Sequence, residues 1–277
     1  GQCVLHEVCG YDCYSTYTGG NAYDQFAYIV VNDVASSKNY VNYSSVVWCV
    51  NERSGSHYSL GLVNGKICCL SVNISMNKCY WHSGIYCRPF KDSNSFTCSL
   101  SHSSLTDNIA TDCVCISFLT GNANCEMKSC NIIRNTQCTL GSQGTFNVCD
   151  NLMIEDSCIL ENKANRIFYQ HHSSCTITLS NCTVDSTSYN QNLVTKNTVT
   201  KSFIHALNHM STQNCHSEYD SAGTLTPIIQ TPSPSKKQRH YYTGNIFFNQ
   251  CQLSDVVSLH KILIFNFIHP YASNDFW

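Results

Sequence analysis

The chain has 277 residues, of which 12% are charged and 43% hydrophobic, with a formal net charge of −2 and a pI near 6.6. This much apolar material can bury a core, which argues against general disorder. The near-neutral charge gives no electrostatic footprint for nucleic acid, so we expect no nucleic-acid partner. Asn, Ser and Thr supply much of the polarity, and they suit turns and stacked strands better than helix surfaces.

A repeat runs through residues 41–187, preceded by a predicted N-terminal cap region at residues 1–25. The repeats align on a reference column with spacings of 25 to 31 residues: Asn51, Asn77, Asn108, Asn135, Asn162 and Thr187. Three positions before each anchor stand Trp48, Ile74, Leu105, Ile132, Ile159 and Val184. Eight positions before stand Tyr43, Cys69, Leu100, Met127, Ile154 and Leu179. Ten positions before stand Val41, Ile67, Cys98, Cys125, Leu152 and Ile177.

These columns predict two short strands per unit, separated by a bend. Positions ten and eight before the anchor alternate with period two, and positions five and three before restore the same face after a polar bend. One unit is too short to bury its apolar face alone, but stacked units about 4.8 Å apart can bury it against one another. The prediction is therefore an all-β, right-handed, single-stranded parallel β-helix of about 25–31 residues per turn. A β-sandwich also has many short strands, but nothing in it requires one column pattern through six units.

The anchor asparagines are predicted to lie where the chain leaves the second strand. Asn tolerates the left-handed backbone that such a corner needs, and stacked amides can form a ladder. A third strand per turn follows at variable distance, at Gly84–Cys87, Cys115–Phe118, Gly144–Phe146, Ile167–Tyr169 and Leu193–Val194. The variable distance indicates loops of different length on that side.

The units at residues 152–162 and 177–185 resemble right-handed parallel β-helix repeats. They are similar to those of the large Cys/Asn-rich surface families of parasitic protists, which are themselves like bacterial polymorphic membrane proteins and adhesins. The resemblance covers roughly residues 20–215. It implies an extracellular or cell-surface protein that acts in adhesion or in contact with a host or partner.

The predicted β-helix domain extends over residues 1–225. Residues 226–240 contain three of the five prolines and are predicted to form an extended linker. The C-terminal tail, residues 241–277, is interrupted by Asp255, His260 and Lys261, which leaves two alternatives. It is either a strand or helix docked on the solenoid end, or a degenerate membrane anchor.

Twenty cysteines without paired Cys-x-x-Cys motifs favour an oxidising, extracellular compartment over zinc binding. Three sequons make Asn42, Asn73 and Asn181 glycosylation candidates. Cys98 and Cys125 occupy one column on adjacent turns, which predicts close approach. They form either a disulfide or two free core thiols.

The sequence contains no catalytic, cofactor-binding or metal-ligating constellation. A glycosidase needs two carboxylates across the scissile bond, whereas Glu126, Glu155, Asp156, Glu161 and Asp185 fall in different columns. The preferred hypothesis is a non-enzymatic surface scaffold for an unidentified protein or glycan, without a cofactor. The alternative is a carbohydrate-active β-helix, a polysaccharide lyase or glycoside hydrolase, that binds its substrate through aromatics such as Trp48, Tyr80, Trp81 and Tyr86.

Overall fold

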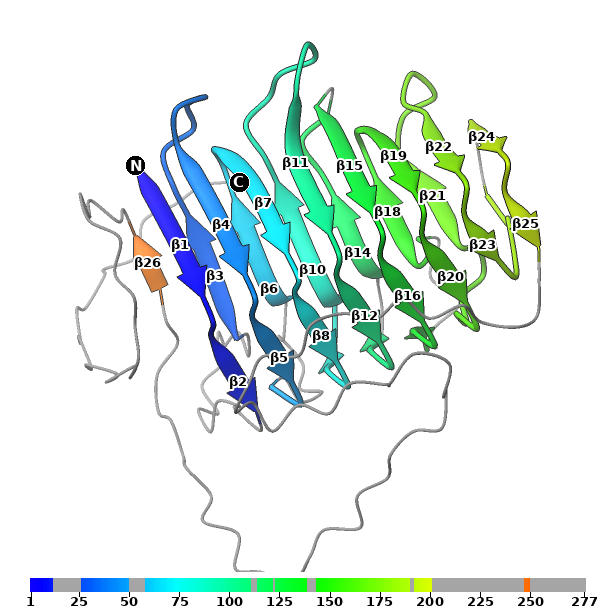
Figure 1. Cartoon of the computed structure of the whole chain (residues 1–277), viewed down its shortest axis with the longest axis horizontal. Helices are drawn as coiled ribbons and strands as arrows, with labels where there is room; N and C mark the ends of the chain where they lie inside the picture. Colours follow the sequence, from blue (N-terminus) through cyan, green and yellow to red (C-terminus); the bar gives the residue numbers. More distant parts are fainter. Residues whose placement is uncertain are drawn as a thin grey trace, which may run out of the picture.

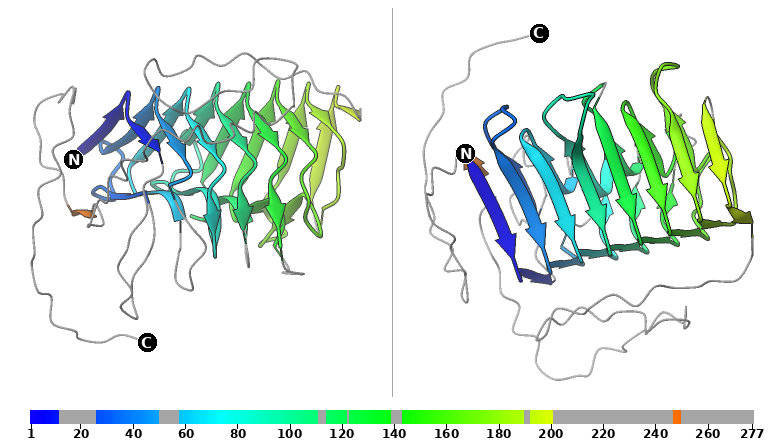
Figure 2. Two further views of the ribbon diagram at one scale, coloured as in Figure 1. Left: turned by 90° about the horizontal axis from the view of Figure 1, so that it is seen from below. Right: turned by 45° about the horizontal axis from the view of Figure 1, so that its top comes forward.

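The chain forms an all-β, right-handed parallel solenoid in which most turns contribute one strand to each of three long sheets (Figure 1). The fold class predicted from the repeat is thereby confirmed. The structure, a computed structural model, describes residues 1–11, 26–49, 58–110, 114–121, 123–138, 143–189, 192–200 and 247–249. It contains no helix in these ranges, and hence no helix able to cross a bilayer. The N-terminal strand lies at one end of the stack and β24 and β25 at the other (Figure 2).

Three long sheets and one short sheet build the solenoid. Sheet A contains β1 (Gln2–His6), β4 (Lys38–Asn42), β7 (Lys66–Leu70), β11 (Phe96–Ser101), β15 (Asn124–Lys128), β19 (Asn151–Glu155), β22 (Ile177–Ser180) and β24 (Leu193–Lys196). Sheet B contains β2 (Cys9–Tyr11), β5 (Ser45–Val47), β8 (Asn73–Ser75), β12 (Ser104–Thr106), β16 (Asn131–Ile133), β20 (Cys158–Leu160), β23 (Thr183–Val184) and β25 (Val199–Thr200).

Sheet C contains β26 (Phe247–Asn249), β3 (Ala27–Val30), β6 (Tyr58–Val63), β10 (His82–Arg88), β14 (Val114–Phe118), β18 (Phe146–Val148) and β21 (Phe168–Gln170). Sheet D contains β9 (Lys78–Cys79), β13 (Ile109–Ala110) and β17 (Thr136–Gln137).

The predicted register of the middle turns is confirmed. Leu105 pairs with Ile132, and Ile132 pairs with Ile159, in parallel strands of sheet B. All three side chains are fully buried in one continuous core that fills the space between the sheets. Each turn leaves its apolar face unburied by itself, so the core exists only because the turns stack.

The predicted register is wrong by two residues in the first repeat. Val46, rather than Trp48, pairs with Ile74, and Val41 pairs with Cys69 rather than with Ile67. Trp48 is 55% exposed and Tyr43 is only half-buried. Both aromatics fitted the apolar columns by polarity, but both have the positive φ of a corner residue, so neither belongs to a strand.

The position of the left-handed corners also differs from the prediction. Positive φ falls on the residue before each described anchor asparagine, at Met76, Asp107, Arg134 and Glu161. A second column of left-handed residues precedes sheet B, at Glu7, Tyr43, Ser71, His102, Ser129, Asp156, Asn181 and Asn197. The anchors themselves have no positive φ, so the ladder asparagines serve hydrogen bonding rather than backbone conformation.

Four of the five predicted third strands lie at sheet C, while the fifth belongs elsewhere. Leu193 pairs with Ile177 in sheet A, so β24 begins a new turn. The third-strand place of the preceding turn is taken by Tyr189, which forms a single bridge to Phe168. The turns at the two ends therefore depart from 25–31 residues: Gln2 pairs with Lys38, 36 residues later, whereas Ile177 and Leu193 are 16 apart.

Most of the C-terminal region lies outside the described residues. This includes the predicted linker and all of the tail except β26, which pairs in parallel with β3 at the N-terminal end of the stack. Most of the predicted cap region, residues 12–25, also lies outside them, as does Asn51.

Candidate ligand-binding surface

The outer face of sheet C carries a column of aromatic and polar residues. Ala27 and Ile29 of β3 point into the core, and so do Ile85 and Cys87 of β10. Because successive side chains of a strand point to opposite faces, the residues between them point outward. This outward column contains Tyr28, Gly61, Tyr86, Ser117, Asn147 and Tyr169.

Glycine at position 61 makes room for the first ring of this column. A Cβ at Gly61 would lie 2.4 Å from Cδ2 of Tyr28. The Tyr28 ring therefore lies flat over the neighbouring strand, where any other residue would push it away. The small residue and the large ring occupy adjacent turns, so they form one surface feature.

Four rings from three turns pack together here, and we call this cluster the aromatic face: Tyr28, Tyr58, His82 and Tyr86. The Tyr58 ring stacks on Tyr28 with centroids 5.6 Å apart, and on His82 at 5.1 Å with planes 3° apart. The centroids of Tyr58 and Tyr86 are 4.6 Å apart. Contacts of this kind contribute about 0.5–1.5 kcal/mol each beyond burial, so the rings are mutually ordered.

The polar atoms of the aromatic face are held in place. The Nδ1 atom of His82 lies 2.9 Å from the Ser117 hydroxyl, which fixes the imidazole plane against Tyr58. Ser117 is fully buried beneath the rings, so its hydroxyl is not accessible for attack on a substrate. Burial raises the pKa of Tyr28 and of Tyr86 above the ordinary phenol value, so both remain hydrogen-bond donors at neutral pH.

This arrangement suits recognition rather than bond cleavage. The three tyrosines are half-buried, so each leaves part of its surface open to solvent. Tyr and Trp side chains combine an apolar body with a polar end, which is why they are common in binding interfaces. A sugar ring matches this surface, because its C–H groups can lie on an aromatic face while its hydroxyls bond to phenols.

The predicted asparagine ladder is present at Asn77, Asn108, Asn135 and Asn162. In each pair of neighbouring turns, the Oδ1 of the later asparagine accepts two hydrogen bonds from the earlier one. One comes from its backbone N–H and one from its Nδ2, at 3.0–3.3 Å. Each Nδ2 also donates to a core-strand carbonyl of the previous turn, such as that of Ile74 for Asn108, at 2.8 Å. Asn77, Asn108 and Asn135 each donate both Nδ2 hydrogens within the protein, so the ladder is a structural element.

Cys98 and Cys125 are directly paired in sheet A, as the column predicted, and both are free thiols in this structure. Hydrogen bonding to the Cys125 thiol, together with that to Cys87 and burial, raises the pKa of Cys98 well above its ordinary value. The thiols therefore stay protonated in the core. Cys9, in sheet B, is disulfide-bonded. Whether Cys98 and Cys125 become linked stays a prediction.

The three sequon asparagines differ in exposure. Asn181 is exposed and donates to Asp156 at 2.6 Å, and Asn42 is half-buried. Asn73 is 2% exposed, so its amide has no room for a glycan in this fold. The folded chain thus leaves Asn42 and Asn181 as acceptor candidates.

The carboxylates considered for catalysis do not converge. Glu155 faces Lys128 at 3.6 Å, and Asp185 accepts from the backbone N–H of Glu161 at a different corner. Glu126 points outward from sheet A, whereas the aromatic face lies on sheet C. Within the described ranges, no group of three or more His, Cys, Asp or Glu side chains is placed to hold a metal ion.

Sequence reasoning identified one member of the aromatic face, Tyr86, and missed Tyr28, Tyr58 and His82. Of the other aromatics it named, Tyr80 and Trp81 contact each other edge to face beside β10, while Trp48 lies at a different corner. The available signal was alternation within the third strand, where Tyr28 stands between Ala27 and Ile29 just as Tyr86 stands between Ile85 and Cys87.

The chain matches no known protein-family model, no curated protein sequence and no solved structure.

Proposed function

We propose that this chain is a non-enzymatic binding scaffold, secreted or displayed at a cell surface, which holds a glycan on its aromatic face. The observation that carries the proposal is the cluster of Tyr28, Tyr58, His82 and Tyr86, which is ordered by stacking and whose three tyrosines are half-exposed on the outer face of sheet C. A rigid set of rings binds with little loss of side-chain entropy, which favours affinity.

Three features support the extracellular part of the proposal. The chain has 20 cysteines, one of which, Cys9, is disulfide-bonded, and such usage is typical of oxidising compartments. Asn42 and Asn181 remain accessible sequons. The repeats resemble those of the Cys/Asn-rich surface families of protists, which supports a role in contact with a host or partner.

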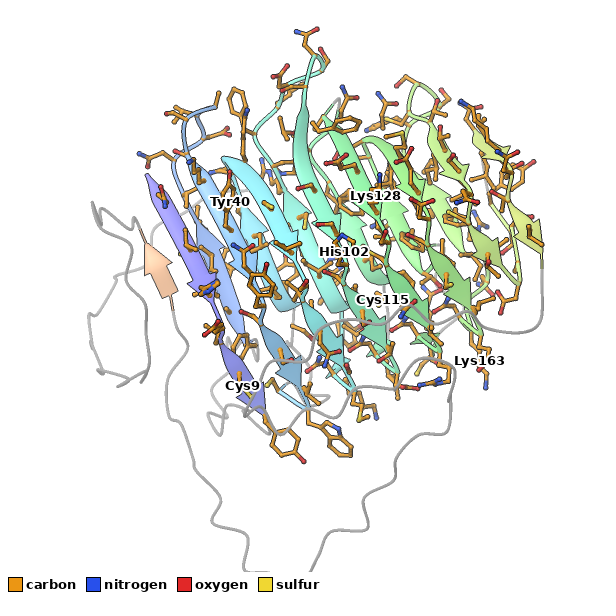
Figure 3. The ribbon with its side chains drawn as sticks, viewed as in Figure 1. Cys9, Tyr40, His102, Cys115, Lys128 and Lys163 are labelled. Carbon is orange, nitrogen blue, oxygen red and sulfur yellow. The ribbon has the colours of Figure 1, made fainter. Side chains whose placement is uncertain are left out.

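A glycan array tests the proposal directly. The purified full chain should bind a defined subset of glycans, and Tyr58→Ala should weaken that binding at least about tenfold, which corresponds to about 1.4 kcal/mol. Tyr40→Ala is the matched control, because Tyr40 is a half-buried tyrosine on the outer face of sheet A (Figure 3). It should leave binding unchanged.

Two results would contradict the proposal. Equal losses for Tyr58→Ala and Tyr40→Ala, at unchanged thermal midpoints, would show that the aromatic face is not the binding surface. Release of shorter fragments from a bound polysaccharide would make the chain an enzyme and would favour the carbohydrate-active alternative.

A further inference from the structure

Sheet C differs from sheet A in the charges that its strands carry. The strands of sheet A contain both lysines and glutamates, and Lys128 pairs with Glu155 at 3.6 Å. The described strands of sheet C contain no aspartate or glutamate, and Arg88, at the end of β10, is their only arginine or lysine. Sheet C therefore carries a cation that no acidic residue of its own strands neutralises.

The register places Arg88 beside the aromatic face. Cys87 points into the core, so Tyr86 and Arg88 on either side of it both point outward, about 7 Å apart along the strand. Arg88 is exposed. Its partner in the preceding turn is Val63, which is aliphatic, so the adjacent strand places no carboxylate against it.

The guanidinium of Arg88 is close enough to two phenol groups of the aromatic face to act on them electrostatically. Burial raises the pKa of Tyr28 and of Tyr86, and the neighbouring Tyr28 phenol adds to the rise at Tyr86. In both cases the positive charge of Arg88 opposes part of the rise in pKa. The two hydroxyls and the guanidinium thus form one group of hydrogen-bond donors on the same face.

Two carboxylates that follow strands of sheet C, Asp92 after β10 and Asp150 after β18, are engaged elsewhere. Asp92 accepts from groups of its own loop, at Asn94 and Ser95. Asp150 is buried and accepts from two backbone N–H groups. Among the described residues no carboxylate forms an ion pair with Arg88. Its guanidinium is therefore available to an anionic group from outside the chain.

We propose that the aromatic face binds an acidic sugar, with Arg88 on a carboxylate or sulfate group and the rings of Tyr28 and Tyr86 against the sugar. This inference rests on the proposed function and names the class of glycan. The planar guanidinium presents paired donors that match the oxygens of an anionic group. The net charge of −2 gives the chain no general attraction for polyanions, so the preference for acidic glycans arises locally at this face.

Glycans that share a backbone and differ by one charged group test the proposal. The full chain is titrated with lactose, with its sialylated form and with its sulfated form. We expect at least about tenfold tighter binding of an acidic form than of lactose itself, and this preference should weaken between low and high salt. The form that binds more tightly identifies carboxylate or sulfate as the recognised group.

Substitution of Arg88 connects this preference to one residue. Arg88→Gln should remove the preference for the acidic form and leave the affinity for lactose and the thermal midpoint unchanged, because the side chain is exposed. Arg88→Lys keeps the charge but not the paired donors, so it should retain part of the preference. Lys38→Gln is the matched control: it makes the same change of charge at an exposed cation 5.8 Å from the Tyr40 ring on sheet A, and it should have no effect.

Three outcomes would overturn the inference. Equal affinity for lactose and its acidic forms, with Tyr58→Ala weakening all of them, would leave the glycan-binding scaffold in place but remove the recognition of charge. Equal losses for Arg88→Gln and Lys38→Gln would show that overall charge, rather than Arg88, attracts the acidic forms. Absence of binding to any glycan would contradict the proposed function together with this inference.

Discussion

The middle turns of the solenoid and the turn that begins with β4 form the same corner differently. The latter holds the first sequence repeat, and we call it the first turn, although β1 and β2 precede it in the stack. In the middle turns the corner is followed by Asn77, Asn108, Asn135 or Asn162, whose amides bond to the turns before and after. In the first turn Cys49 takes this place. The backbone N–H of Cys49 donates to the Oδ1 of Asn77, as the N–H of a ladder asparagine would. The thiol of Cys49, however, donates to the carbonyl of Val47 in its own turn.

This difference shows what the asparagines contribute. The left-handed residue precedes the anchor in both regions, at Trp48 in the first turn and at Asp107 in a middle turn. The corner therefore forms without asparagine. Each ladder asparagine satisfies a carbonyl and an N–H of the turn before its own, deep in the structure where water cannot replace them, as Asn77 does for Val46 and Cys49. Cys49 has no side-chain amide with which to do the same for the turn before it.

The largest effect is expected from removal of an amide within the ladder. Asn108→Ala leaves the N–H of Asn77 and the carbonyl of Ile74 without their partners in a fully buried site. At about 1–3 kcal/mol for each of the two groups, the free energy of unfolding should fall by about 2–6 kcal/mol. Denaturant titration with a fixed m-value measures it.

Asn162→Ala is the matched control for Asn108→Ala. Asn162 makes the same types of bond but is half-buried, so water can replace the lost amide. Its loss should cost less than half as much. Equal losses at the two positions would mean that the ladder amides act through something other than buried hydrogen bonding.

The second prediction concerns packing in the middle turns. Ile132 is fully buried between Leu105 and Ile159, so Ile132→Ala should cost about 2–5 kcal/mol through lost burial and the cavity left behind. Lys128→Ala, on the exposed side of sheet A, should change stability by less than about 0.5 kcal/mol. Similar denaturant midpoints for the two variants would contradict the assignment of the faces.

The middle turns could be predicted from the sequence because their spacing is regular and their anchors are chemically alike. The first turn could not, because Cys49 replaces the asparagine while Asn51 lies two residues further on and imitates an anchor. Polarity alone did not distinguish Trp48 on a corner from an apolar residue in a strand. To predict the aromatic face, one must know which residues of successive third strands pair with one another. The loops before these strands differ in length, so a single sequence does not give that register.

The third prediction concerns an ion pair that the middle turns have and the first turn lacks. The guanidinium of Arg134 donates from Nε and Nη2 to the two carboxylate oxygens of Asp107, both at 2.7 Å, on adjacent corners. The pair is partly exposed, so its coupling should be about 0.5–1 kcal/mol. A double-mutant cycle with Arg134→Ala and Asp107→Ala measures it. Coupling that does not weaken between low and high salt would argue against an electrostatic origin.

The smallest effect is expected at the aromatic residue on the first corner. Trp48 is 55% exposed and contacts the sulfur of Met76 through its indole N–H, so Trp48→Ala should lower stability by no more than about 0.5 kcal/mol. Backbone strain does not change, because alanine and tryptophan both have the Cβ that disfavours the φ of 56° found there. Val46→Ala, two residues earlier, removes a side chain that is 1% exposed and should cost about 1.5–3 kcal/mol. If the order were reversed, with Trp48 the costlier site, the first turn would have the register that its sequence suggests, in which Trp48 rather than Val46 lies beside Ile74.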